Sequence, residues 1–247
     1  MNLAPLEMSV PAVDGLILKG TLTYPETFAG VAFPLAVLTH QYPATRDSYA
    51  PLVADLVESG VATLAFDLRG HGASIISTSG PLVIDTPEGL TLEDFGKAFM
   101  SSAAKVGFSR IDNDVFRVAS WGANQNFIDA GRLALVGASI GGSGVLLAAG
   151  KIPNLRALAT LGAAGAPAIG SEAEARIRTT LEQSKTPCYL ASAREDPFDG
   201  GANVTTWSRG LSHVTARLVP GSAHAMAIYF EVRDELLRFL LNSLGLQ

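Results

Sequence analysis

The stretch between Arg132 and Lys151 limits most strongly what this chain can fold into, because it contains no charged residue and five glycines. Its length is close to that of a membrane span. The glycines and serines within it are instead typical of a sharp turn between two elements. We therefore interpret it as a buried strand at residues 133–136, followed by a turn and a helix.

Regular alternation of apolar segments and helical patterns follows this stretch. Strands are predicted at residues 155–161, 188–193 and 214–219, with helices between them and a closing helix at residues 227–244. An antiparallel strand pair is predicted near the start, at residues 6–24. Strands alternating with helices indicate an α/β fold with a largely parallel sheet covered on both faces.

Composition excludes several classes of protein. Hydrophobic residues make up 48% of the chain and charged residues only 17%, which excludes an intrinsically disordered chain. The net charge of −5 predicts no broad basic surface, so neither nucleic acid nor a membrane is an expected partner. The single cysteine, Cys188, excludes an intrachain disulfide and a zinc site built from several cysteines.

No linker and no internal repeat divides the sequence, so we expect one domain spanning residues 1–247. Residues 1–7 show no basic stretch followed by an apolar run, so no signal peptide is visible and a cytoplasmic location is expected. The sequence leaves the oligomeric state open.

The first candidate catalytic residue is Ser139, in the pentapeptide Gly-Ala-Ser-Ile-Gly at residues 137–141. The motif follows the apolar strand and opens a helix, which places the serine at a strained tip beside free helix N–H groups. The alternative is a glycine-rich turn that binds phosphate, but neither the P-loop spacing nor the G-x-G-x-x-G spacing is present. We interpret Ser139 as a nucleophile.

A serine hydroxyl needs a base, and the base needs an acid to orient it. His224 lies just after the last predicted strand and is the candidate base; its alternative role is to cap the following helix. Asp196 lies just after the preceding strand and is the candidate acid, with Asp199 and Glu195 close by. Because Asp196 precedes Pro197, it could instead only shape a turn.

On these residues the chain resembles the α/β-hydrolase superfamily over nearly its whole length. The order Ser139, Asp196, His224 matches the nucleophile, acid and base order of that family. Residues 67–74 resemble its D-x-R-G-x-G-x-S turn, and residues 40–43 stand where it usually has His-Gly-x. The nearest resemblance is to small dienelactone-hydrolase-like and serine carboxylesterase-like members.

The resemblance implies a sheet of about eight mostly parallel strands with helices on both faces, a small insertion and no large cap. It also implies an oxyanion hole formed by two backbone N–H groups. One belongs to Ile140, the residue after the nucleophile, and the other to Tyr42 or to Gln41, which replaces the usual glycine.

The function implied is that of a serine hydrolase acting on a small-molecule ester through an acyl-enzyme, without a metal or organic cofactor. Many dienelactone hydrolases carry cysteine as the nucleophile, so the serine favours a general esterase. The alternatives are a peptidase, an amidase or a thioesterase of the same fold, or a non-catalytic binding protein.

The segment at residues 75–110 is a candidate lid-like insertion, because it leaves the same sheet edge as the predicted catalytic residues. It is predicted to hold a helix near residues 92–105 and, at residues 74–89, only loop. Its Phe95 and Phe99 are expected to line the substrate pocket, although an ordinary packed helix would also explain them. The other residues predicted for substrate binding are Gln41, Trp207 and Met226.

Overall fold

The computed structural model describes residues 3–25, 32–89 and 91–246. Eight strands form one sheet in the order β1-β2-β4-β3-β7-β8-β9-β10, and two further strands form a small hairpin. The strands are β1 (Leu3–Pro11), β2 (Ile17–Pro25), β3 (Phe33–Thr39), β4 (Ala62–Phe66), β5 (Ile76–Ser77), β6 (Gly80–Pro81), β7 (Ile128–Ala138), β8 (Leu155–Leu161), β9 (Cys188–Ala193) and β10 (Val214–Val219). In the large sheet β2 runs antiparallel to both of its neighbours, β1 and β4, and the other neighbouring strands pair in parallel. The predicted α/β-hydrolase sheet is thus confirmed.

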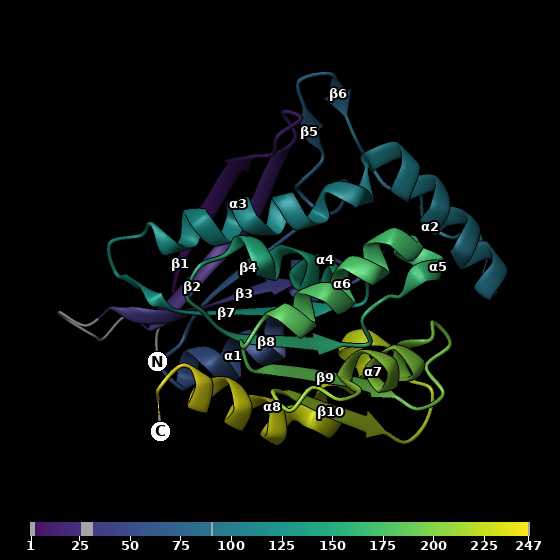
Figure 1. Ribbon diagram of the computed structural model, residues 1–247. Coiled ribbons are helices and arrows are strands. Elements are labelled where there is room, and N and C mark those ends of the chain that lie inside the picture. The colour runs from purple at the N-terminus through teal and green to yellow at the C-terminus, as the bar shows by residue number, and fades with distance from the viewer. Residues whose placement is uncertain (1–2, 26–31, 90, 247) are drawn as a thin grey trace.

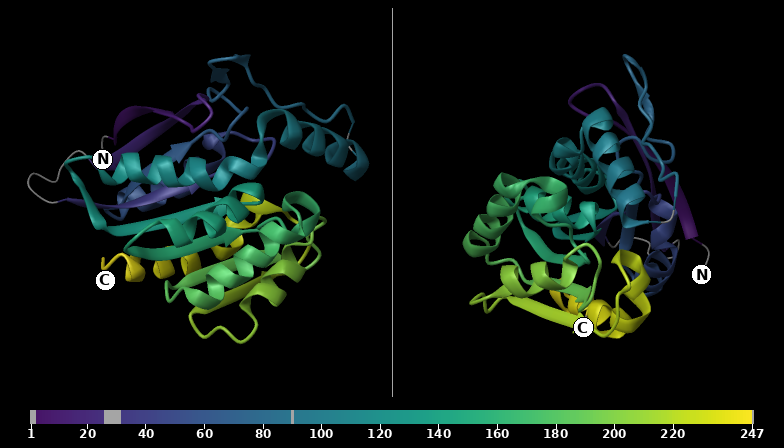
Figure 2. Two further views of the ribbon diagram at one scale, coloured as in Figure 1. Left: turned by 45° about the horizontal axis from the view of Figure 1, so that its top comes forward. Right: turned by 90° about the vertical axis from the view of Figure 1, so that its right-hand side faces the viewer.

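Helices connect the strands and cover both faces of the sheet (Figure 1). They are α1 (Ala50–Glu58), α2 (Leu92–Val106), α3 (Ile111–Ala123), α4 (Ile140–Ala148), α5 (Ala166–Ile169), α6 (Ser171–Gln183), α7 (Gly200–Ser208) and α8 (Tyr229–Ser243). Short 3-10 turns lie at Arg46–Tyr49, Phe108–Arg110, Ala149–Lys151 and Ala225–Ile228. The second view in Figure 2 shows α1 and α8 on the opposite side of the sheet from α3, α4 and α6.

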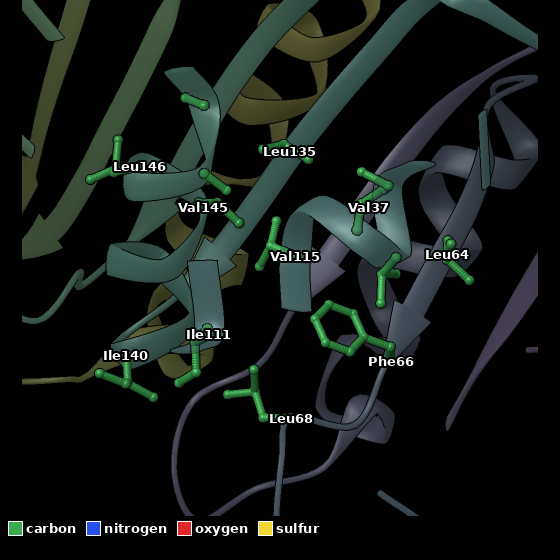
Figure 3. Packing of buried hydrophobic residues seen from close by; sticks show 14 of the residues in the cluster. Val37, Leu64, Phe66, Leu68, Ile111, Val115, Leu135, Ile140, Val145 and Leu146 are labelled. Atoms are coloured by element: carbon green, nitrogen blue, oxygen red, sulfur yellow. The ribbon is translucent and has the colours of Figure 1, made fainter. Parts of the chain in front are cut away.

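Each face of the sheet therefore has its own apolar core. Strands β3 and β4 are buried along their full length, as expected for parallel strands covered on both sides. Figure 3 shows the core under α3 and α4, where Val37 and Leu135 of the sheet lie near Val115 and Val145 of the helices. This packing fixes the strand ends that carry the candidate site.

The predicted insertion contains more structure than the sequence indicates. The expectation of loop alone at residues 74–89 is wrong, because β5 and β6 pair there as a two-residue antiparallel hairpin. Helix α2 begins with a reciprocal capping box between Thr91 and Asp94 and ends at Gly107, which has a φ of 75°. Residue 90 of this segment lies outside the described residues.

A buried ion pair anchors the insertion to the rest of the fold. Arg69, which is fully buried, donates to both carboxylate oxygens of Asp114 on α3 at 2.6 and 3.1 Å, and to the carbonyl of Val106 at 2.7 Å. Burial and these carboxylates act in opposite directions on Arg69, and its pKa is raised on balance. The turn at residues 67–74, which resembles the D-x-R-G-x-G-x-S turn, therefore has a structural role: its Arg69 holds the end of α2 against α3.

Within the part of the chain that the structure describes, no helix combines the length and the apolar character that a membrane crossing requires.

Candidate active site

Ser139 lies at the tip of the turn between β7 and α4, as the motif predicts. Its backbone has a φ of 51° and a ψ of −122°, a conformation that residues other than glycine rarely adopt. The turn is tight, because a Cβ added at Gly141 would lie 2.2 Å from the carbonyl oxygen of Thr39. The glycine therefore allows the helix to start directly against the end of β3, with the serine half exposed above it.

The structure joins His224 to Asp196 and not to Asp199. The Nδ1 atom of His224 lies 2.9 and 2.8 Å from the two carboxylate oxygens of Asp196. That carboxylate also accepts hydrogen bonds of 2.9 Å from the hydroxyl of Ser192 and from the backbone N–H of Phe198. Asp196 is buried, whereas Asp199 is exposed at the start of α7. Because the carboxylate is held on several sides, it can fix the orientation of the imidazole ring.

The end of β8 lies between Ser139 and the Asp196–His224 pair. The backbone N–H of Ser139 donates to the carbonyl of Leu161 at 3.1 Å. A Cβ added at the next residue, Gly162, would lie 3.0 Å from Asp196 Oδ2 and 3.2 Å from His224 Nδ1. Ser139, Asp196 and His224, the three residues predicted from the sequence, therefore lie around the end of one strand.

The two loops predicted to form an oxyanion hole also meet near this point. Ile140 is the first residue of α4, so its backbone N–H belongs to the group that has no partner within the helix. Tyr42 is buried in the loop after β3. His40 fixes that loop: its Nε2 accepts from the backbone N–H of Leu68 at 2.9 Å, so its Nδ1 carries the proton and donates to the carbonyl of Gln41 at 2.8 Å.

His40 and His71 form a buried pair beside this loop, with ring centroids 5.0 Å apart. Burial, reinforced by the neighbouring His71, lowers the pKa of His40 to about 3. Burial also lowers the pKa of His71 to about 4, against the opposing effects of the Arg69 carbonyl and Asp67. Both rings are therefore neutral in the folded protein at neutral pH, and both are buried and weaker bases than an exposed histidine.

The histidine pair predicts loss of stability in acid. Histidines in the unfolded chain have a pKa near 6.5. Below that pH, His40 and His71 bind protons in the unfolded chain but stay unprotonated in the folded one. The free energy of unfolding should fall as the pH drops from about 6.5 towards 4, by up to about 1.4 kcal/mol per pH unit for each histidine. Urea unfolding at several pH values measures this slope.

His71→Asn should reduce the slope, whereas His213→Asn, at a half-buried position remote from the pair, should leave it unchanged. An equal slope in all three proteins would contradict the assignment.

A cavity of about 200 Å³ opens beside Ser139, and its lining is mainly aromatic and apolar. We call it the aromatic cavity; it is lined by Tyr42, Phe95, Gly96, Phe99, Met100, Ser139, Ala164, Gly165, Pro167, Ala168, Pro197, Phe198 and Asp199. Phe95 and Phe99 come from α2, so the inserted helix does lie beside Ser139 as expected.

Phe198 is the aromatic residue of this cavity that was not expected from the sequence. Its ring centroid lies 4.6 Å from that of His224 and 4.8 Å from that of Phe95. Its backbone N–H also binds Asp196. The only signal in the sequence was its position two residues after the candidate acid, which by itself does not show where a side chain points.

Three residues predicted for substrate binding do not line the aromatic cavity. Trp207 is 2% exposed in the core under α7, where its indole N–H donates to Glu174 at 3.3 Å, because α7 packs flat against β9 and β10. Met226 packs against the core on the opposite face of the sheet. Gln41 is half-buried in the loop after β3, and its Oε1 atom has no hydrogen-bond partner among the residues that the structure describes.

Across residues 3–25, 32–89 and 91–246, no three His, Cys, Asp or Glu side chains come together as a metal site would require.

Comparison with known families agrees with this geometry. The family model of the alpha/beta hydrolase fold matches residues 34–180, which include the turn at Ser139. The chain belongs to the alpha/beta hydrolase family. No curated protein matches this alpha/beta hydrolase.

Solved structures share the fold of this alpha/beta hydrolase over almost its whole length. They include a dienelactone hydrolase from Anabaena variabilis, 18% identical, with 98% of this chain and 96% of that chain covered and a TM-score of 0.66. An esterase from Pyrococcus furiosus is 16% identical, with 98% and 92% covered and a TM-score of 0.69. An acetyl xylan esterase from Paenibacillus sp. R4 is 18% identical, with 97% and 84% covered and a TM-score of 0.68. At these identities the likeness concerns the fold.

Proposed function

We propose that the protein is a serine hydrolase that cleaves carboxylic esters. The observation that carries this proposal is the hydrogen-bonded pair of His224 and buried Asp196, gathered with the strained Ser139 around the end of β8. The positive φ of Ser139 is a strained backbone conformation that costs folding free energy, and the carboxylate of Asp196 fixes the orientation of the His224 imidazole. A surface that only binds a ligand needs neither feature.

The mechanism follows from the roles of these groups. His224 accepts the hydroxyl proton of Ser139 on Nε2 as the serine oxygen attacks the ester carbonyl. The N–H groups of Ile140 and Tyr42 stabilise the negative charge on the carbonyl oxygen. The protonated His224 then gives its proton to the departing alcohol. A water molecule, activated by His224, hydrolyses the acyl-enzyme and returns the serine to its starting state.

Two observations favour an ester over a peptide. The aromatic cavity is small and apolar, which suits an uncharged ester better than a peptide chain with many polar groups. Structures with the same fold include a dienelactone hydrolase and two esterases. A thioester would undergo the same chemistry and is the second substrate class to test.

The decisive experiment is covalent labelling with an active-site-directed fluorophosphonate. We expect one label per chain, located on Ser139 by peptide mass analysis. Hydrolysis of p-nitrophenyl esters should then exceed hydrolysis of aminoacyl p-nitroanilides, because the ester group needs less help to expel its leaving group. Absence of labelling and of ester hydrolysis would favour a non-catalytic binding protein, and faster cleavage of the anilides would favour a peptidase.

A further inference from the structure

A second, larger cavity is lined by Ile140, the residue that follows Ser139. Its volume is about 500 Å³, within the range of small-molecule sites, and it lies between α3 and α6. We call it the α3–α6 cavity; it is lined by Ala103, Phe108, Ser109, Ile111, Asp112, Ile140, Ser143, Gly144, Leu147, Ala168, Ile169, Gly170, Ser171, Glu172, Ala173 and Arg176. Figure 3 shows Ile111 and Ile140, which belong to its apolar wall.

The two cavities lie end to end beneath the same helix. On α2, Gly96 and Met100 line the aromatic cavity and Ala103 lines the α3–α6 cavity. Residues at this spacing share one face of a helix, so α2 passes over both cavities in turn. On the opposite side, Ala168 of the short helix α5 lines both. The two cavities are therefore neighbours that share Ala168 as a common wall, which brings the α3–α6 cavity next to the one beside Ser139.

The direction of the reaction decides which part of an ester enters which cavity. The leaving alcohol must lie on the side of His224, because that residue supplies its proton. Phe198, whose ring lies against His224, lines the aromatic cavity, so the alcohol belongs there. The acyl chain must leave in the other direction, past Ile140, whose side chain lines the α3–α6 cavity.

Part of the lining of the α3–α6 cavity is polar and charged, at Asp112, Glu172 and Arg176. Asp112 is buried and accepts hydrogen bonds from Lys151 at 2.7 Å and from Arg176 at 3.4 Å. The side chain of Arg176 is 55% exposed, and its guanidinium has more donors than this one long contact employs. Glu172 adds a second carboxylate to the lining, so the cavity offers two carboxylate acceptors and the guanidinium donors of Arg176. Acceptors and donors together suit an uncharged group that can both donate and accept hydrogen bonds.

We propose that the acyl chain of the substrate runs from Ser139 past Ala168 into the α3–α6 cavity. Its far end carries an uncharged hydrogen-bonding group, such as a hydroxyl, that binds Arg176 and Asp112. The preferred substrates are thus esters of medium-length ω-hydroxy acids. This inference rests on the proposed ester hydrolysis and specifies its substrate class.

The test compares kcat/KM for p-nitrophenyl acetate, octanoate and 8-hydroxyoctanoate. The wild type should prefer octanoate to acetate, and 8-hydroxyoctanoate to octanoate. Ile169→Trp, which fills the α3–α6 cavity, should lower the octanoate-to-acetate ratio by about tenfold. Arg176→Ala should lower the 8-hydroxyoctanoate-to-octanoate ratio by about fivefold, the effect expected of one net hydrogen bond.

Matched variants keep the test decisive. Ser171→Trp fills the same cavity from an exposed position and replaces Ile169→Trp if that protein does not fold. Ala175→Trp, on the exposed side of α6, and Arg209→Ala, after α7, should leave both ratios unchanged. Circular dichroism checks that each variant is folded.

Each outcome has a distinct meaning. If the wild type hydrolyses none of the esters and is not labelled by the fluorophosphonate, the proposed function itself fails. If it hydrolyses esters but Phe99→Trp, and not Ile169→Trp, lowers the octanoate-to-acetate ratio, the acyl chain binds in the aromatic cavity and the inference is overturned. If the wild type does not prefer 8-hydroxyoctanoate to octanoate, or if Arg176→Ala keeps that preference, the proposal that the terminal hydroxyl binds Arg176 is overturned.

Discussion

Ser139→Ala should abolish ester hydrolysis while the protein stays folded. Loss of the nucleophile leaves only substrate binding and the oxyanion hole, and in the best-studied serine hydrolase the resulting loss of kcat is about a million-fold. Alanine is close in size to serine and is strained to a similar degree by the φ and ψ at this position, so the turn between β7 and α4 should persist. Initial rates with p-nitrophenyl esters and a thermal unfolding curve measure the two effects separately.

Ser120→Ala is the matched control, because the hydroxyl of Ser120 binds only the carbonyl of Phe116 in its own helix α3. It should retain full activity. Retention of more than about a tenth of the wild-type rate by Ser139→Ala would show that another group is the nucleophile. A loss of activity that small is incompatible with removal of the attacking atom.

Asp196→Asn should lower kcat by about ten-thousand-fold, with little change in the fold. An asparagine at this position can donate a hydrogen bond to Nδ1 of His224 and so favour the tautomer that carries its proton on Nε2. That tautomer cannot accept the proton of Ser139. The size of the effect is taken from a well-studied triad, and steady-state kinetics at saturating ester measures it.

Asp199→Asn provides the comparison at the neighbouring position. Asp199 is exposed and has a φ of 62°, a conformation that asparagine adopts readily, so this change should cost little stability. Because Asp199 only lines the aromatic cavity, the change should cost far less activity than Asp196→Asn. If Asp199→Asn were the more damaging of the two, the assignment of the acid to the hydrogen-bonded Asp196 would be wrong.

The central strands could be predicted from sequence because burial on both faces leaves a continuous apolar run. Strands at residues 155–161, 188–193 and 214–219 are found at the predicted bounds. The meeting of the three candidate residues at one edge of the sheet could also be predicted, from the direction of the strands. Since parallel strands end at one edge of the sheet, Ser139, Asp196 and His224 were expected on the same side.

The pocket walls could be predicted only in part, because they depend on the path of loops and on which side of a short helix faces inward. Phe95 and Phe99 were found from their place on a long amphipathic helix beside the site. Phe198 was not expected in the cavity, because it follows a turn whose direction cannot be predicted from the local sequence. Trp207 was expected in the cavity but lies in the core, because the face of α7 that carries it packs against the sheet. Helix α5 was missed because four residues give no helical period.

The position of His224 has a consequence for how the site comes apart. Ser139, the proposed nucleophile, follows β7, a strand with neighbours on both sides, but His224, the proposed base, follows β10, an edge strand with one neighbour in the described sheet. In β10 only Val219 is fully buried. Edge strands with little burial are the first part of a sheet to fray. With His224 as the proposed base, partial unfolding from this side would displace it while the turn at Ser139 persists, so we expect activity to be lost on heating before the core of the sheet unfolds.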